Sequence, residues 1–403
     1  MRTIQLLSRA AYGVHAADQT ALVAVPLVAA LAFDASAQTI GILVACQSLA
    51  HLIGSLPFGI LVDRGESRRV ALGAIVLCVM GFLGAATCVW AKMIVPFAFC
   101  VVLGSGGIVL FVLTTLSILP KTAEAAHLAS ANAALELPRA AASFAVPLVL
   151  GLVVTAQTAG LVFGVGALLA ATALIWVWQL PSVPVAPAIA APPSPLRQIK
   201  EGAYHVLRSQ ILRAIALCAI FWNLAFAALL VAMVPFLSGA LRVEPGMFGI
   251  ALACFGAGAI CGAWVSRRYG NTFQPRVILV LGPLTSMTVP AVLLALPAEG
   301  ALIVVFAAFF ALGFVPSMWL VVQNAVRQTV TPGHVLGRVN AVIQTAIYGV
   351  RPLGALSSGA IITAYGVRAG LAFVCVLFTL SAAVAVLTRL RRIQRFSDLS
   401  YAD

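Results

Sequence analysis

The chain consists largely of long apolar runs separated by short polar connections. A helix needs about 20 consecutive apolar residues to cross the hydrocarbon core of a bilayer. The runs show no strict alternation of apolar and polar residues, so they predict helices rather than barrel strands. They cover residues 10–33, 38–62, 70–91, 94–119, 131–155, 158–180, 211–239, 245–266, 275–297, 300–323, 339–364 and 368–388. The pattern predicts an all-α membrane protein with twelve transmembrane helices.

The second half of the chain repeats the first about 208 positions later. Residues 130–133, Ser-Ala-Asn-Ala, return as residues 338–341, Arg-Val-Asn-Ala, and residues 151–156 return as residues 359–364. A duplicated membrane bundle usually places a substrate path between its two repeats. The repeat therefore predicts two six-helix halves and points to a transporter.

A proline-rich connection separates the two halves. Six prolines within residues 181–195 predict a stiff, extended linker. Residues 196–209 then show an amphipathic pattern, which predicts a helix at the cytoplasmic interface; an extension of the seventh span is the alternative. We expect halves at residues 1–180 and 211–390, the linker with its amphipathic helix at 181–210, and a cytoplasmic tail at 391–403.

Composition and charge exclude a water-soluble protein. Hydrophobic residues make up 62% and charged residues 9%, whereas soluble domains carry about 25% charged residues. The net charge of +13 comes mainly from Lys and Arg in connections of one parity, which is the positive-inside pattern. It places both termini in the cytoplasm and indicates anionic lipid headgroups, not nucleic acid, as neighbours. We expect a multi-pass protein of a bacterial inner membrane that acts as a monomer.

Signatures of enzymes and metal sites are absent from the sequence. The eight cysteines fall within apolar runs and show no metal-ligand spacing, so we expect them to be packing residues and predict no metal site. No phosphate-binding loop is present, which argues against an enzyme and against ATP as the energy source. We expect no cofactor and a proton gradient as the energy source.

The connection after the second run contains a glycine, an Asp-Arg pair and a basic pair at short spacing. These residues are Gly59, Asp63, Arg64, Arg68 and Arg69. The segment resembles the signature loop of the major facilitator superfamily and lies where that family has it. The resemblance implies the twelve-helix fold of that family and a gating contact at the cytoplasmic side.

The resemblance is incomplete. Glycine directly follows the Asp-Arg pair, and the second-half copy keeps only the basic pair Arg267-Arg268. Two shorter stretches, Ala17-Asp18 with Val25-Pro26 and Ala131-Asn132-Ala133, resemble the bacterial efflux group that includes macrolide and siderophore exporters.

Two polar residues interrupt the first span. Asp18 lies near mid-depth, and His15 precedes it by three positions on the same helix face. An aspartate inside a membrane is a candidate for proton exchange, and a neighbouring histidine is a candidate relay. We predict proton coupling through Asp18 and His15; the alternative is a structural Asp18 that accepts hydrogen bonds from a neighbouring helix.

Three further charges lie inside spans. Glu136 and Arg139 are three positions apart, which predicts an ion pair or, alternatively, a switchable gate. Arg351 has no acidic neighbour in sequence, and an arginine at mid-membrane is expected to face the protein interior. Its partner is predicted to be Asp18, Glu136 or an anionic substrate.

Other polar or aromatic residues within the spans are candidates for substrate binding, with helix-to-helix hydrogen bonding as the alternative. Besides Arg351 they are Asn223, Trp319, Gln47, His51, Gln344 and Tyr348. The remaining spans are apolar, which favours an amphipathic substrate over a sugar. We predict proton-coupled efflux of drug-like or siderophore-like small molecules. The alternatives are uptake of an anionic metabolite, flipping of lysolipids or lipids, and a sensor that transports nothing.

Overall fold

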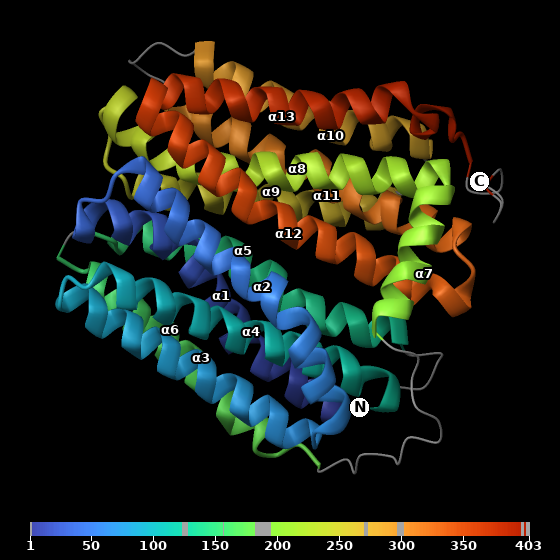
Figure 1. Ribbon diagram of the computed structural model, residues 1–403, viewed down its shortest axis with the longest axis horizontal. Helices are drawn as coiled ribbons and strands as arrows, with labels where there is room; N and C mark the ends of the chain where they lie inside the picture. Colours follow the sequence, from blue (N-terminus) through green and yellow to red (C-terminus); the bar gives the residue numbers. More distant parts are fainter. Residues whose placement is uncertain are drawn as a thin grey trace. The chain divides into compact units, whose positions relative to one another are not determined.

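A computed structural model describes most of the chain, and Figure 1 shows its ribbon. The described residues are 2–122, 128–155, 157–181, 195–269, 273–295, 302–395 and 399. Within these ranges all regular structure is helical. The prediction of an all-α protein is confirmed.

Twelve long helices correspond to the twelve apolar runs. They are α1 (Arg2–Phe33), α2 (Ala37–Arg64), α3 (Ser67–Trp90), α4 (Ile94–Thr122), α5 (Leu128–Val153), α6 (Ala159–Val177), α8 (Gln210–Pro235), α9 (Met247–Tyr269), α10 (Pro275–Ala295), α11 (Leu302–Val330), α12 (Gly333–Tyr365) and α13 (Val367–Leu387). Among the described residues, eleven helices are long and apolar enough to cross a membrane. The remaining long helix is α12, which contains Arg338 and Arg351.

Three short helical segments complete the described structure. They are α7 (Pro195–Arg208), the π-helical turn η2 (Phe236–Ala240) and the 3-10 turn η3 (Arg389–Arg392). The helix α7 coincides with the amphipathic segment that follows the proline-rich linker. In Figure 1 it runs across the direction of α8, α12 and α13.

The helix boundaries confirm the internal repeat. The helices α8, α10, α11 and α13 each begin 208 positions after α1, α3, α4 and α6. The backbone repeats as well, because Asp34 after α1 and Arg242 after η2 both adopt the left-handed conformation, with φ of 49° and 52°. Residues other than glycine seldom adopt this conformation. Two positions 208 apart therefore end the first helix of each half in the same unusual way.

The contacts divide the chain into two units. One comprises Met1–Pro187 with Val243–Ala253, and the other Ala188–Arg242 with Cys254–Asp403. The beginning of α9 groups with the first unit because Gly249 lies against Gly151 of α5, where a Cβ would stand 2.6 Å from the Gly151 Cα. Small residues allow this approach, and in lipid such close packing replaces the hydrophobic driving force.

Within the first unit, α1 packs on α5 and α6, and α3 packs along α4. Gly81 and Gly107 make the second contact possible. A Cβ at Gly81 would stand 2.3 Å from the Gly104 nitrogen, and one at Gly107 would stand 2.5 Å from the Ala74 oxygen.

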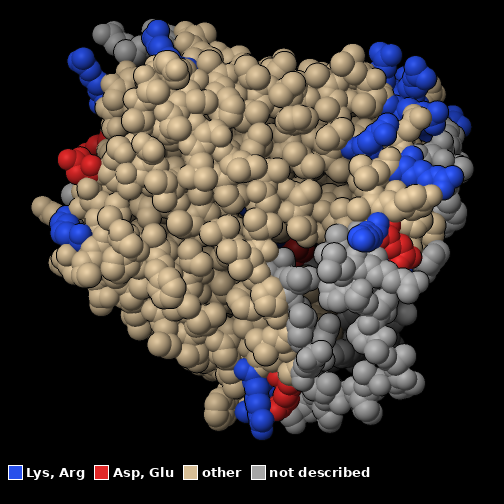
Figure 2. All heavy atoms as spheres, in the orientation of Figure 1, with Lys and Arg blue, Asp and Glu red and all other residues tan. Residues whose placement is uncertain are grey.

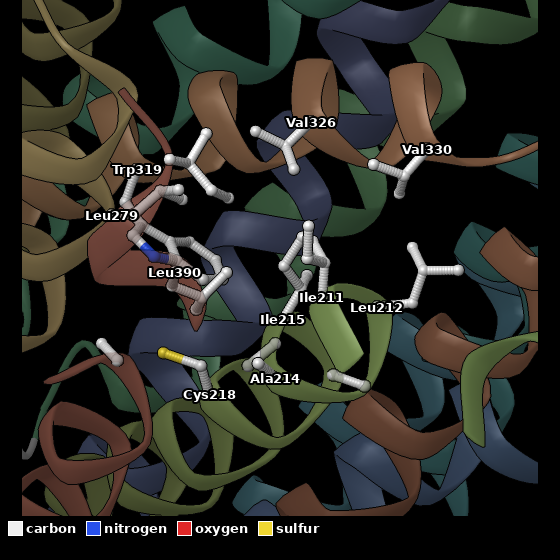
Figure 3. Packing of buried hydrophobic residues seen from close by; sticks show 14 of the residues in the cluster. Ile211, Leu212, Ala214, Ile215, Cys218, Leu279, Trp319, Val326, Val330 and Leu390 are labelled. Atoms are coloured by element: carbon white, nitrogen blue, oxygen red, sulfur yellow. The ribbon is translucent and has the colours of Figure 1, made fainter. Parts of the chain in front are cut away.

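The core of the second unit lies between α8 and its neighbours. Figure 3 shows Ile211, Ile215 and Cys218 of α8 on one side of the cluster, with Val326 and Val330 of α11 facing them. These side chains are all at most 3% exposed. The helix α8 also packs on α12 and α13, and its contact with α12 positions the candidate site.

The surface is consistent with a membrane protein. On the face drawn in Figure 2, residues without charge cover most of the described surface, and Lys, Arg, Asp and Glu form a few separate groups. Large apolar side chains are exposed on several spans, among them Leu168 of α6, Phe99 of α4 and Ile303 of α11. Such exposure is expected where hydrocarbon rather than water covers the surface.

Candidate functional site

The mid-membrane arginine of the second unit has a defined partner on a neighbouring helix. Arg351 lies near the middle of α12, and its Nε donates a hydrogen bond to the Oδ1 of Asn223 on α8 at 3.0 Å. The Asn223 side chain is 8% exposed, and its Nδ2 donates to the Ala219 oxygen at 2.9 Å. The amide is therefore held from its own helix and presents its oxygen to the guanidinium.

The close crossing of α8 and α12 brings these two side chains together. One turn beyond Arg351, a Cβ at Gly354 would stand 2.2 Å from the Leu224 oxygen. One turn further, the hydroxyl of Ser358 donates to the Ala228 oxygen at 2.9 Å. A small residue and a hydroxyl at successive turns let the backbones approach. Gly354 and Ser358 thus allow the close contact between α8 and α12 that positions the Arg351 guanidinium.

An aromatic ring lies beneath the same guanidinium. The Cζ of Arg351 is 5.4 Å from the centroid of the Tyr348 ring, one turn earlier on α12. Arginine has five N–H donors, and a guanidinium stacked on a ring keeps its donor-bearing edge away from the ring. Within the described residues, Nε makes the one hydrogen bond of Arg351. The two terminal nitrogens form the fork that matches a carboxylate.

Arg351 forms no ion pair with the residues described in the second unit. Among the residues that the structure describes in this unit, Glu201 is the sole acid, and it pairs with Arg338 at 2.5 Å. The helices α8, α10, α11, α12 and α13 contain no Asp or Glu. The sequence analysis expected an acid or a substrate beside Arg351, whereas its partners in its own unit are a neutral amide and a phenol ring.

The aromatic residues next to Asn223 on α8 contact other helices of the unit. The Trp222 ring stacks on Phe226 with centroids 5.1 Å apart, and its indole nitrogen donates to the Ser286 hydroxyl on α10 at 2.9 Å. Gln344, one turn of α12 before Tyr348, is exposed. The flat ring that the described residues place at the guanidinium is that of Tyr348.

Trp319 lies in the apolar core of the second unit and is 9% exposed. Its burial matches the alternative of helix packing, and a role in substrate binding stays a prediction. Figure 3 shows it beside Leu279 and Leu390. It packs against Gly282 of α10, where a Cβ would stand 2.6 Å from the Trp319 Cβ. Trp319 therefore serves helix packing, and we do not carry it into the proposed site.

The first unit contains a related polar contact between its first and fifth helices. His15 of α1 lies within electrostatic range of Arg139 and Glu136 on α5. Glu136 and Arg139 form an ion pair on α5, with 2.6 Å between Nη2 and Oε2 and 2.7 Å between Nε and Oε2. Both side chains are more than half exposed. Asp18 is half-buried one turn further along α1.

The internal repeat relates some residues of these two groups. His15 and Asn223 lie 208 positions apart, as do Glu136 and Gln344. Arg351 corresponds to Ser143, so the charged residues of the two fifth helices do not occupy equivalent positions. Sequence reasoning named all four residues and did not connect them, although the repeat distance was the signal that could have done so.

The remaining predicted residues lie on α2 and at its end. Gln47 is buried and His51 is half-buried on α2. The side chains of Gly59, Asp63 and Arg64 lie outside what the structure describes, so the gating contact of Asp63 stays a prediction. After α2, Arg69 pairs with Glu66 at 2.8 Å, and the Arg68 guanidinium lies 5.2 Å from the centre of the Trp178 ring.

Sequence reasoning missed a buried arginine on α11. It did not single out Arg327, which is 9% exposed in the structure. Its Nη2 donates to the Asn324 Oδ1 at 2.7 Å, and the same oxygen accepts from the Gln323 Nε2 at 2.6 Å. The helical spacing of Trp319, Gln323 and Arg327, which are four positions apart, could have placed all three on the inward face.

Among the described residues, no group of three His, Cys, Asp or Glu side chains is arranged to hold a metal ion.

Comparison with known proteins agrees with this architecture. Enterobactin exporter EntS of Escherichia coli and of Escherichia fergusonii are each 27% identical over 310 residues, which is 75% of this chain and 71% of theirs. A D-xylose-proton symporter superposes with a TM-score of 0.72 at 12% identity and covers 98% of both chains. A POT family transporter in complex with 5-aminolevulinic acid superposes with a TM-score of 0.74 at 12% identity, over 96% of this chain and 95% of its own. These two structures share the fold of this chain.

The family model described as Major Facilitator Superfamily matches residues 10–350. Together with the repeated helices and the transporter relatives, this match identifies a multi-pass membrane transporter rather than an enzyme. The chain belongs to the Major Facilitator Superfamily.

Proposed function

We propose that this secondary transporter exports amphipathic small molecules that carry an anionic group, in exchange for protons across a bacterial inner membrane. The observation that carries the proposal is Arg351, a mid-span cation held by Asn223 and Tyr348 in a unit whose spans contain no acid. The 27% identity to exporters of enterobactin supports efflux of siderophore-like compounds.

The energetics of a buried cation favour an anionic ligand. A charged side chain within a membrane costs several kcal/mol unless it is paired or hydrated, by about 2.5–3.5 kcal/mol on insertion scales. The hydrogen bond from Asn223 and the ring of Tyr348 offset part of this cost and leave the charge itself uncompensated within the unit. A carboxylate or catecholate oxygen that binds the terminal nitrogens supplies the missing charge.

Proton coupling is assigned to Asp18, with His15 as its neighbour on α1. His15 is within electrostatic range of the Glu136–Arg139 pair. A change in the charge of His15 therefore changes the electrostatic potential at these two residues of α5. Alternating access then moves one half of the molecule relative to the other as the proton and the substrate exchange. In this scheme the exporter releases the substrate when Asp18 takes up a proton.

The test measures accumulation of an anionic and a neutral amphipathic compound in cells that lack their own efflux pumps. Wild type should lower accumulation of the anionic compound, and a protonophore should abolish the effect. Arg351→Gln should lose at least about tenfold of this export, since hydrogen bonds to a charged group contribute about 1.5–3 kcal/mol. Arg351→Lys should retain a fraction, because lysine keeps the charge but loses the fork.

Asp18→Asn separates energy coupling from binding. We expect it to remove proton-driven export while the anionic compound still protects the purified transporter against thermal unfolding. Export that is unchanged in both Arg351→Gln and Asp18→Asn would refute the proposal.

Uptake of an anionic metabolite is the second candidate, and the same arginine favours it. The two functions differ in direction. Increased accumulation of an anionic compound in wild-type cells, insensitive to Asp18→Asn and lost in Arg351→Gln, would replace export by uptake.

A further inference from the structure

At one end of the first unit, arginines of two helices stack on tryptophans of a third. The Arg9 guanidinium of α1 lies 4.8 Å from the centre of the Trp176 ring, and that of Arg68 at the start of α3 lies 5.2 Å from the Trp178 ring. Both rings belong to the end of α6. Stacking fixes each guanidinium plane and leaves its N–H edge for a second partner. The end of α6 thus carries one arginine of α1 and one of α3, each on its own tryptophan ring.

A cleft lies beside these stacked pairs. It has a volume of about 210 Å³ and is lined by Arg2, Thr3 and Leu6 of α1 and by Gln179 and Pro181 after α6. Leu6 is buried, whereas Arg2 and Gln179 are exposed, so an apolar base lies below a polar, cationic rim. No acidic residue lines it among those described. The lining matches a singly charged phosphodiester in sign and in hydrogen-bond donors.

The outer face of α6 indicates that the occupant is a lipid rather than a free ion. Leu161, Val165, Leu168 and Ile175 are each at least half exposed and lie on one stripe of the helix. The stripe ends at Trp178, which is 67% exposed next to the cleft residue Gln179. Tryptophan at a span end lies at headgroup level, and exposed apolar side chains below it contact acyl chains.

We propose that the ends of α1, α3 and α6 form a binding site for one anionic phospholipid. Its phosphodiester enters the cleft and accepts hydrogen bonds from Arg2 and Thr3, its acyl chains lie along α6, and Arg68 on Trp178 adds positive charge at the rim. Basic sites at span ends bind anionic headgroups in this manner. The site is independent of the transported substrate and of the direction of transport.

The test uses the full-length transporter, purified in a non-ionic detergent and titrated with phosphatidylglycerol or phosphatidylcholine of identical acyl chains. Native mass spectrometry counts the lipids that stay bound. Wild type should retain one phosphatidylglycerol in preference to phosphatidylcholine. Retention should fall about fivefold in Arg2→Gln and further in Arg2→Gln/Arg68→Gln, because each basic residue near an anionic surface contributes attraction of that order.

The matched control is Arg268→Gln. Arg268 also stacks on an aromatic ring, with its Cζ 5.4 Å from the Tyr269 centroid, but it belongs to the second unit. It should retain the lipid like wild type. Arg2 is exposed, so Arg2→Gln tests the site even if the double variant unfolds. Three results would overturn the proposal: equal retention in Arg2→Gln and wild type, equal binding of the two lipids, or displacement of phosphatidylglycerol by an equal concentration of inorganic phosphate.

Discussion

At the scale of single residues, the second unit depends on a polar contact between Asn223 and Arg351 across two apolar helices. A neutral partner keeps the arginine oriented without cancelling its charge, whereas an acid at the same place would neutralise it. In the proposed function, the neutrality of residue 223 is the property that leaves Arg351 able to bind an anion.

Asn223→Asp tests this distinction directly. The carboxylate occupies the same volume and lies 3.0 Å from the Arg351 Nε, so it should form an ion pair and remove the preference for anionic substrates. We expect transport of an anionic substrate to fall at least about tenfold, with a smaller change for a neutral analogue. The measurement is transport of both compounds at equal protein levels.

Ser358→Ala, in the same contact between α8 and α12, is the control for this substitution. It removes the hydrogen bond to the Ala228 oxygen and should cost about 1 kcal/mol of stability without changing the ratio of the two transport rates. An unchanged ratio in Asn223→Asp would show that residue 223 does not set the charge preference.

At the scale of helices, glycines decide where two backbones meet. Gly354 allows α12 to cross α8 close to Leu224, and Gly202 allows α7 to lie against the Arg338 backbone of α12. A methyl group at either position would stand within 2.5 Å of a carbonyl oxygen, well inside van der Waals contact. Gly337 of α12, in contrast, has open space where a Cβ would stand, so the presence of a glycine in the sequence does not show whether the packing requires it.

Gly354→Ala should destabilise the transporter by about 1–3 kcal/mol, the cost typical of overpacking a tight contact. A Cβ there would stand 2.2 Å from the Leu224 oxygen. Gly337→Ala on the same helix is the control, since a Cβ meets nothing within 4 Å and alanine favours the helix. Thermal unfolding in detergent compares the two. Equal midpoints would contradict the close crossing.

Gly202→Ala should release α7 from α12. A Cβ at this position would stand 2.5 Å from the Arg338 oxygen, and moving α7 would also break the Glu201–Arg338 ion pair. We expect faster amide hydrogen exchange in residues 200–208 than in wild type. Lys200→Ala, at an exposed position of the same helix, should leave the exchange rate unchanged. Equal exchange in both variants would mean that Gly202 does not hold α7.

At the scale of the whole molecule, the two units do not coincide with the two repeats. The beginning of α9 belongs by sequence to the second repeat but groups with the first unit, where Gly246 and Gly249 lie against Gly151 of α5. This contact is made by glycine backbones rather than by interlocking side chains.

Gly249→Val should separate the beginning of α9 from α5. We expect faster hydrogen exchange in residues 247–253, because the added side chain cannot fit where a Cβ would stand 2.6 Å from the Gly151 Cα. Gly239→Val in η2, where a Cβ meets nothing within 4 Å, is the control and should leave this exchange unchanged. Protection of residues 247–253 that persists in Gly249→Val would argue against the glycine contact.

The sequence by itself determined the class of protein and its internal symmetry. Apolar runs about 20 residues long allow only spanning helices, since unsatisfied backbone groups are too costly in lipid. The distance of 208 residues between matching motifs, now seen in helix starts and in Asp34 and Arg242, fixed two related halves. These features are local or periodic, so they can be read from the order of residues.

Only the tertiary structure decided which side chains meet. Arg351 finds Asn223, 128 positions away, because α12 crosses α8 at Gly354. Trp319 is buried because α11 packs on α10 and contributes to a core shared with α8, and Arg327 of the same helix is also buried. Contacts between distant helices depend on crossing geometry and on which small residues permit it. The hydropathy pattern does not specify that geometry, so the partners of each polar residue can be identified only from the packed structure.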